Sequence, residues 1–250
     1  MSENDEVATK KMTVNSCTVA ILQSNYIPWK GYFDIIHGAD IFIFYDDLQF
    51  TKNDWRNRNK IKTAQGSKWL SIPVGTSANR LICEVAMEDA QWQRSHWDSL
   101  QHQYKKCPYF RLYLPFFEEL YLGRHWSNLS ELNQYLIRYI SLDILKMPTQ
   151  FRDSREFQLS GQKLDRLLDL VVQSKATRYV SGPAAKEYIQ PERFDELGVE
   201  LVWKDYSNYP EYPQAHPPFE HGVSILDLLF NVGPEAPRFI WGWRNEKASS

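Results

Sequence analysis

The sequence predicts an α/β protein with a Rossmann-like, mixed but mainly parallel sheet and a helical insertion. Two apolar stretches with β-branched members, at 18–22 and 40–47, flank a helical stretch, which is the arrangement of a βαβ unit. The second half of the chain repeats the alternation of helix and strand. Between these parts, from about 92 to 147, the apolar residues recur with the helical period of about 3.6 residues.

The first βαβ unit begins with a buried strand. Thr18–Leu22 and "DIFIFYDD" are apolar enough for two such strands. Between them, "PWKGYFDIIHGA" predicts a helix of about two turns that Pro28 opens, because proline suits the first helical turn. Parallel sheets with right-handed crossovers bind ligands just beyond the carboxyl ends of their strands. The two stretches that follow such ends are "ILQSNYIPWKGYF" and "DDLQFTKNDWRNRNK".

A hairpin and three helices are predicted next. "KIKT" and "KWLSIPV" are separated by a turn-like tetrapeptide, and "LICEVAM" is expected to add a further strand, which makes the predicted sheet mixed. Asn128 or Ser130 is the expected N-cap of the third helix. The three helices are expected in "WQRSHWDSLQHQYKK", "FRLYLPFFEELYLG" and "NLSELNQYLIRYISLDILKM".

The remaining elements alternate in type. Pro183 opens a short helix directly after a strand, and Gly233 closes the last helix because glycine is favoured just past a helix end. In order, we expect the helix "KLDRLLDLVVQSKA", the strand "RYVSG", the short helix "PAAKEYI", the strand "VELVWKDY", a loop over Tyr206–Gly222 and the helix "SILDLLFNVG".

Composition limits the class of protein. Residues 1–16 are polar and predict a disordered tail, and 17–250 predict a single α/β domain that contains the helical segment at 92–147. No secretory signal and no run of 18 apolar residues is found, so we expect a cytoplasmic protein without an integral membrane segment. With 29 basic and 31 acidic residues, the net charge of −2 does not favour a nucleic acid partner. Three scattered cysteines fit a reducing compartment and predict no metal site, and no cofactor is assigned.

The densest polar cluster follows the second strand. Asp46 and Asp47 stand at the strand end, where a carboxylate suits a general base, a ribose ligand or a Mg²⁺ ligand. Adjacent strand residues point in opposite directions, so one of the two is expected to face the site. Forked guanidinium and amide donors around a tryptophan indicate a polar, anionic ligand. The candidate substrate-binding residues here are Gln49, Lys52, Trp55, Arg56, Asn57, Arg58 and Asn59, with Arg56 and Arg58 on one face.

The stretch after the first strand supplies a second set of binding residues. Gln23 and Asn25 offer amides, and Tyr26 and Trp29 offer flat aromatic faces. Gly31 is expected to let a ligand or another backbone approach closely.

Three further places are candidates. Ser181 and Gly182 lead from a strand into a helix, whose free N–H groups suit a phosphate or carboxylate. Lys186 adds positive charge to the first turn of that helix, which a bound anion would offset. His96 lies on an amphipathic helix and is either a structural histidine or a catalytic one. The candidate catalytic residues are therefore Asp46, Asp47, His96 and Lys186.

Known catalytic signatures help mainly by their absence. The sequence has no HExxH, GxSxG, P-loop, paired CxxC or full GxGxxG motif, which disfavours zinc hydrolases, serine hydrolases, Walker-type ATPases and NAD enzymes. The opening unit resembles that of adenylyl-transferring enzymes with a His-x-Gly-His signature. Here the signature is Trp29-Lys30-Gly31-Tyr32, with both histidines replaced.

Five motifs in order resemble the WbqC-like protein family over about Val19 to Pro234. Genes of this family often lie in bacterial clusters for O-antigen of lipopolysaccharide and other surface glycans. The resemblance implies transfer of an acyl or aminoacyl group from its donor to a nucleotide-linked amino sugar. The motifs are "LQSNYIPWKGYFDII", "DIFIFYDDLQFTKNDWRNRNKI", "YKKCPYF", "YVSGPAAKEYI" and "SILDLLFNVGP".

Two other functions compete with this transferase. A nucleotidyl transferase or ATP-dependent ligase would be built on the opening βαβ unit and would consume ATP. A noncatalytic glycan-binding protein would need the aromatic residues but neither aspartate. Release of pyrophosphate separates the first from the transferase, and the variants Asp46→Asn and Asp47→Asn separate the second.

Overall fold

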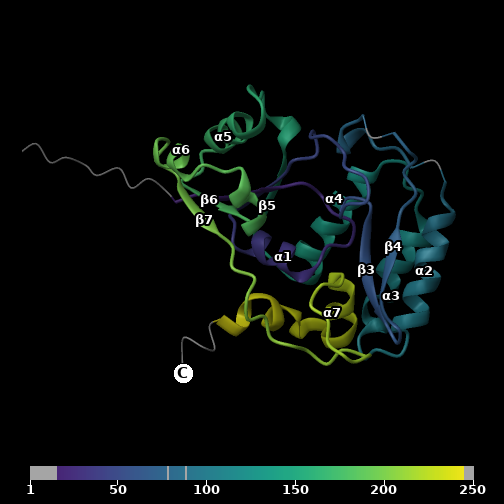
Figure 1. The fold of residues 1–250 in the computed structure, drawn as a ribbon. Coiled ribbons are helices and arrows are strands. Elements are labelled where there is room, and N and C mark those ends of the chain that lie inside the picture. The colour runs from purple at the N-terminus through teal and green to yellow at the C-terminus, as the bar shows by residue number, and fades with distance from the viewer. Residues whose placement is uncertain (1–15, 78, 88, 245–250) are drawn as a thin grey trace, which may run out of the picture.

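The computed structural model describes residues 16–77, 79–87 and 89–244, so the predicted tail lies outside the described residues except for Ser16. A five-stranded sheet forms the centre of the protein (Figure 1). Its strand order is β5-β2-β1-β6-β7, and all neighbouring strands are parallel. The strands are β1 (Thr18–Leu22), β2 (Ile41–Phe44), β5 (Gln150–Asp153), β6 (Arg178–Ser181) and β7 (Glu200–Trp203).

The central strands are apolar because helices cover both faces of the sheet. Along β1, Val19 belongs to one buried cluster and Ala20 to the other, as the two-residue period of a strand requires. The face with Ala20 packs against α1 (Lys30–His37), and the face with Val19 packs against α5 (Lys163–Gln173) and α6 (Pro191–Asp195). The predicted α/β fold with a mainly parallel sheet is therefore confirmed.

The predicted hairpin forms a separate sheet. β3 (Arg58–Thr63) and β4 (Gly66–Ser71) pair antiparallel with each other and lie beside the helix α2 (Gln91–Tyr104) (Figure 1). Ile61 and Leu70 pack into the same cluster as the helical segment, so the hairpin's apolar side is buried without joining the central sheet. Among the described residues, the central sheet is consequently parallel throughout.

The expected strand in "LICEVAM" is wrong. Ile82–Glu84 forms a single 3₁₀ turn. Ile82 and Val85, three residues apart, are both fully buried, which fits a turn better than strand alternation. The Glu84 carboxylate accepts a hydrogen bond of 2.8 Å from the Leu81 N–H and closes the turn.

The three helices of the central segment are present. The Asn128 side chain accepts a hydrogen bond of 3.0 Å from the Glu131 N–H, which identifies Asn128 as the N-cap of the third helix. Ser224 caps the last of the predicted helices in the same manner, and Gly233 ends it with a φ of 58°. These helices are α2 (Gln91–Tyr104), α3 (Phe110–Glu118), α4 (Leu129–Tyr139) and α7 (Ile225–Val232).

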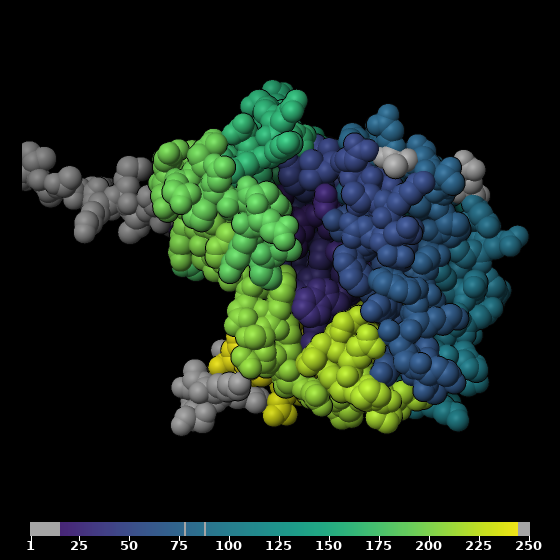
Figure 2. All heavy atoms as spheres, in the orientation of Figure 1, coloured from purple at the N-terminus to yellow at the C-terminus, as the bar shows by residue number. Residues whose placement is uncertain are grey.

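The strand order places a switch point between β1 and β6. From β1 the chain crosses through α1 to β2 on one side, whereas β6 and β7 lie on the other side of β1. Ligands of open α/β sheets bind in the crevice outside the strand ends at such a point. Figure 2 shows a hollow there, with the N-terminal segment (purple) as its floor between the segment near β6 (green) and the one near β3 (blue).

Candidate functional site

A half-buried arginine, Arg56, holds two amides at the floor of this hollow. The Arg56 guanidinium donates hydrogen bonds to the Gln23 Oε1 and to the Asn25 Oδ1. The Asp54 carboxylate lies 3.7 Å from the guanidinium, so the hydrogen bonds of the fork go to neutral amide oxygens. Burial lowers the pKa of Arg56, yet an arginine stays charged in proteins. Because charged donors bond most strongly to anionic oxygens, the guanidinium suits a phosphate or carboxylate.

Two pockets lie on either side of the Arg56 guanidinium, which is among the lining residues of neither. One, the tryptophan pocket, has a volume of about 290 Å³ and is lined by Asn25, Pro28, Trp29, Trp55, Asn59 and Gly222. The other, the tyrosine pocket, has a volume of about 700 Å³. Since Gln23 lines the tyrosine pocket and Asn25 lines the tryptophan pocket, the guanidinium that binds both amides lies at their junction. The tyrosine pocket is lined by Ile21, Leu22, Gln23, Tyr45, Leu48, Lys163, Leu164, Leu167, Tyr179, Tyr188 and Gln190.

The loop between these amides and α1 contains a strained residue. Ile27 has a φ of 37°, a conformation that β-branched residues rarely adopt. The Asn59 side-chain amide donates hydrogen bonds to the carbonyls of Tyr26 (3.1 Å) and Ile27 (2.9 Å) and holds the loop in this shape. The Tyr26 N–H adds a bond of 3.0 Å to the Trp55 carbonyl. Backbone strain of this kind is concentrated at functional sites.

Gly31 makes room for the Trp29 ring. A Cβ atom at position 31 would overlap that ring, so only a glycine allows the indole to lie against the start of α1. Tyr206 and Tyr209 pack edge-on against the same indole, with ring centres 5.0 and 6.0 Å away. The glycine predicted to admit a ligand thus fixes a wall of the tryptophan pocket.

Trp55 forms the outer part of this pocket. Its side chain is 44% exposed, and its ring lies 5.3 Å from that of Trp69, which is 39% exposed. The Arg58 guanidinium stacks 4.3 Å above the Trp69 ring and donates to the Asn53 carbonyl. Arg56 and Arg58, predicted to share a face, therefore have different partners.

The two candidate bases are held by other side chains. Asp46 is fully buried and accepts hydrogen bonds from the Ser24 N–H (2.7 Å), the Ser130 hydroxyl and the Gln134 amide (3.1 Å). Asp47 forms an ion pair with Arg166 and accepts from the Ser154 hydroxyl. The two carboxylates have different partners, as expected of neighbours after a strand, and neither lines the two pockets. Their role as base stays a prediction.

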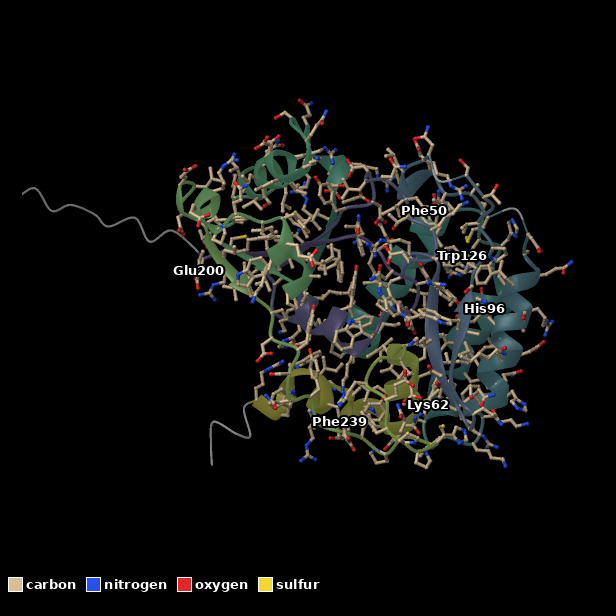
Figure 3. All side chains as sticks on the ribbon, in the orientation of Figure 1. Phe50, Lys62, His96, Trp126, Glu200 and Phe239 are labelled. Atoms are coloured by element: carbon tan, nitrogen blue, oxygen red, sulfur yellow. The ribbon has the colours of Figure 1, made fainter. Side chains whose placement is uncertain are left out.

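His96 lies on α2 beside the hairpin of β3 and β4 (Figure 3), in a buried hydrogen-bonded chain. Its Nε2 faces the Ser71 carbonyl at 3.2 Å and therefore carries the proton, so its Nδ1 accepts from the Tyr26 hydroxyl at 2.9 Å. That hydroxyl in turn accepts from the Tyr121 hydroxyl at 2.6 Å. Burial lowers the pKa of His96 to about 4, so the ring is neutral at pH 7. Among the described contacts, His96 supports Tyr26, and neither residue lines the two pockets.

The candidates after β6 are divided between the protein interior and the outer surface, and Ser181 and Gly182 line neither pocket. Ser181 is buried at the end of β6, and a Cβ on Gly182 would lie 3.3 Å from the Tyr206 hydroxyl. Lys186 is exposed on a 3₁₀ helix over Pro183–Glu187, with its ammonium 5.5 Å from the centre of the Trp203 ring. Lys186 does not line either pocket.

The last three candidates lie away from the pockets. Gln49 and Lys52 are exposed in the loop after β2, where Gln49 forms a bridge with Leu81. The Asn57 amide donates to the Ile72 carbonyl at 2.9 Å and so joins the start of β3 to the residue after β4. These contacts give Asn57 a structural function.

Sequence reasoning missed several pocket residues. Tyr45 follows β2 directly, and Tyr188 lies within the predicted short helix and directly after the observed 3₁₀ helix, but tyrosines at such positions look like ordinary core or surface residues. Leu164 and Leu167 were expected only as the apolar side of an amphipathic helix. The fold assigns all four to the tyrosine pocket.

Two absences apply to the described part of the chain. No group of three or more histidine, cysteine or acidic side chains in it has the arrangement that could hold a metal ion. Across 16–77, 79–87 and 89–244, none of the helices combines the length and apolar character needed to cross a bilayer.

Comparison with known proteins finds one protein family whose model matches most of the chain. The model of the WbqC-like protein family matches residues 23–239, which include both pockets except for two residues of β1. The uncharacterized protein Rv1507c of Mycobacterium tuberculosis is 44% identical over 224 residues, which cover 89% of this chain and 96% of that protein. No solved structure matches the chain.

Proposed function

Because the chain belongs to the WbqC-like protein family, we propose that it is a cytoplasmic enzyme of surface-glycan biosynthesis. It transfers an acyl or aminoacyl group from a donor to the amine of a nucleotide-linked amino sugar. The products are building blocks of bacterial glycans such as the O-antigen of lipopolysaccharide. Three features of the hollow support this proposal.

The observation that carries the proposal is the position of Arg56. Its guanidinium lies at the junction of the two pockets, and its fork binds neutral amides of Gln23 and Asn25. A pyrophosphate presents anionic oxygens at the spacing that a guanidinium binds with two hydrogen bonds. The linkage between a nucleoside and its sugar therefore fits at this point.

The tryptophan pocket suits the sugar. Its volume of about 290 Å³ is at the lower end of the range of about 300–1,000 Å³ for small-molecule sites. The indoles of Trp29 and Trp55 provide flat apolar faces for the C–H groups of a sugar ring, and the Asn25 amide provides a polar group beside them.

The chemistry requires one proton acceptor. The amine nitrogen of the sugar attacks the carbonyl carbon of the donor, a C–N bond forms, the bond to the leaving group breaks, and the amine loses a proton. Asp46 and Asp47 remain our candidates for the acceptor. Asp46 is the better placed of the two, because it bonds to the N–H of Ser24, which stands between Gln23 and Asn25.

The test is acyl transfer by the purified protein. Nucleotide-linked amino sugars are incubated with acyl-coenzyme A donors in the absence of ATP, and mass spectrometry detects an acylated sugar nucleotide. A parallel incubation with ATP and an amino acid tests the competing ligase. We expect the product with the wild-type protein and at least a hundredfold slower formation with Arg56→Lys, which keeps the charge but loses the fork. Arg178→Lys, on an exposed ion pair with Glu200, is the matched control and should leave the rate within twofold.

Two outcomes contradict the proposal. Pyrophosphate released from ATP without any acylated sugar would support the nucleotidyl transferase. Equal rates for Arg56→Lys and wild type would show that the guanidinium does not bind the substrate.

A further inference from the structure

We propose that the tyrosine pocket binds the base and ribose of a nucleoside diphosphate, whose phosphates lie on Arg56. A nucleotide sugar then spans the hollow, with its base in the tyrosine pocket and its sugar in the tryptophan pocket. The sugar part of this inference rests on the proposed function, whereas the nucleotide part can be tested without it.

The first argument is the position of the tyrosine pocket in the fold. Gln23 follows β1, Tyr45 follows β2 and Tyr188 comes soon after β6, so residues beyond the carboxyl ends of three strands line the same pocket. This is the crevice at the switch point between β1 and β6, where nucleotides are bound in open α/β sheets. Figure 2 shows that the hollow is open to a ligand at this edge.

The second argument is the chemistry of the walls. Leu48, Leu164 and Leu167 provide aliphatic surface, and three tyrosine rings provide flat surface, which together suit a planar base. Tyr45 is only 7% exposed, and the Arg166 guanidinium beside its ring can only donate, so no side chain among the described residues accepts the proton of the Tyr45 hydroxyl. Burial raises the pKa of Tyr45, so the hydroxyl stays protonated and is available to donate to a ligand.

The third argument concerns the path between the pockets. Gln23 lines the tyrosine pocket and accepts a hydrogen bond from the Arg56 guanidinium. Tyr188 lines the same pocket, and the charge of Arg56 lowers the pKa of Tyr188, whereas burial raises it. Phosphates attached to a nucleoside in this pocket therefore reach the guanidinium.

Pocket size decides the direction of the nucleotide sugar. A nucleoside is larger than a single sugar ring, and the tyrosine pocket, at about 700 Å³, is more than twice as large as the tryptophan pocket at about 290 Å³. The opposite orientation would place the larger group in the smaller pocket.

Binding measurements test the inference on the full-length protein. Calorimetry is performed with UDP, dTDP, ADP, GDP and inorganic pyrophosphate. We expect at least one nucleoside diphosphate to bind at least tenfold more tightly than pyrophosphate. Leu164→Trp fills the tyrosine pocket from a half-buried position on α5. It should lower the affinity for that nucleotide at least tenfold and leave the affinity for pyrophosphate within twofold of the wild type.

Two further variants sharpen this experiment. Val172→Trp adds the same side chain to α5 at a residue that is 51% exposed and outside the pocket, so it should leave all affinities within twofold. Tyr45→Phe removes only a hydroxyl and should weaken the nucleotide about threefold to tenfold, as the loss of one hydrogen bond does. This variant keeps the test valid if Leu164→Trp does not fold.

The opposite results overturn the inference. Nucleoside diphosphates that bind no better than pyrophosphate, or that bind equally well to wild type, Leu164→Trp and Tyr45→Phe, exclude the base from this pocket. If Trp55→Ala binds the free nucleoside diphosphate ten times more weakly than the wild type, the base lies in the tryptophan pocket instead. Nucleotide binding without any acyl transfer would uphold this inference and reject the proposed function.

Discussion

At the scale of single residues, buried polar side chains do most to shape the site. Asp46, His96 and Asn59 each use their hydrogen-bonding atoms to hold the backbone or a neighbour of the loop after β1. Unpaired burial of such groups would cost free energy, so each is matched by specific donors and acceptors. The floor of the hollow therefore depends in part on Asp46 and His96, which line neither pocket.

His96 makes stability depend on pH. Its pKa is lowered to about 4 in the folded protein, against about 6.5 in an unfolded chain, so the unfolded state binds more protons between these values. The contribution of His96 to the free energy of unfolding should consequently be complete above pH 6.5 and should fall as the pH decreases towards 4. We expect His96→Gln, which keeps one donor and one acceptor, to show a smaller loss between pH 7 and pH 5 in urea unfolding.

A matched control is His125→Gln, at an exposed histidine. It should retain the pH dependence of the wild type. If His96→Gln and wild type lose the same free energy between the two pH values, the histidine is not held neutral by the fold.

At the scale of elements, the start of α1 connects packing to the site. The helix begins at Lys30 after Trp29, whose ring lies over Gly31 and against two tyrosines of the loop after β7. From the sequence, Gly31 could be needed for backbone flexibility, but in the structure it is needed because the Trp29 ring occupies the space where a Cβ atom would lie.

Gly31→Ala should therefore displace the Trp29 ring. The added Cβ overlaps the indole, so we expect a loss of about 1–3 kcal/mol in the free energy of unfolding, as for other overpacked sites, and a changed tryptophan fluorescence spectrum. Gly38→Ala, at the other end of α1, meets its nearest atoms at 3.6 Å and is the control. Similar losses for the two variants would contradict this explanation.

Element prediction succeeded where one period was strong and failed where the signal was short. β1 and β2 are apolar on both faces, and the helices of the central segment keep the helical period, so both kinds were predicted. β5, "QFRD", is a four-residue edge strand with one apolar residue and gives no such signal. The 3₁₀ turn at Ile82–Glu84 carries apolar residues that a strand would also use.

Prediction of the site was limited by contacts that are distant in sequence. The stretches after β1 and β2 were predicted to bind a ligand, because ligands of parallel sheets bind beyond the strand ends. These stretches supply most residues of the tryptophan pocket. Asp46 was predicted as a base from its position at a strand end, but the residues that hold its carboxylate could not be predicted. Its partners Ser130 and Gln134 are 84 and 88 residues away and become neighbours only in the fold.

At the scale of the whole molecule, one buried carboxylate joins the first helix to the end of the described chain. Asp34 on α1 is 1% exposed and binds the Lys204 ammonium at 2.7 Å, the Tyr209 hydroxyl at 2.6 Å and the Arg244 guanidinium at 2.8 Å. These partners follow β7 or lie near the C-terminus, close to α1 in Figure 1. The interaction fixes the segment that packs on Trp29.

Asp34→Asn should destabilise the protein strongly. It leaves two cations without their shared carboxylate, and loss of one partner of a buried ion pair typically costs about 3–5 kcal/mol. Glu200→Gln, at the exposed pair with Arg178, should cost no more than about 1 kcal/mol. Urea unfolding of both variants checks this, and equal costs would show that burial of the Asp34 group does not matter.

The strained backbone at Ile27 has a consequence for how a ligand is selected. The Asn59 side chain holds the carbonyls of Tyr26 and Ile27, so contacts within the protein fix the loop in one shape. A ligand that fits it loses little free energy in ordering the protein, so the fit is tight for one shape and poor for related ones. Rigid molecules that are complementary to the shape of this loop are accordingly better starting points for inhibitors than flexible ones.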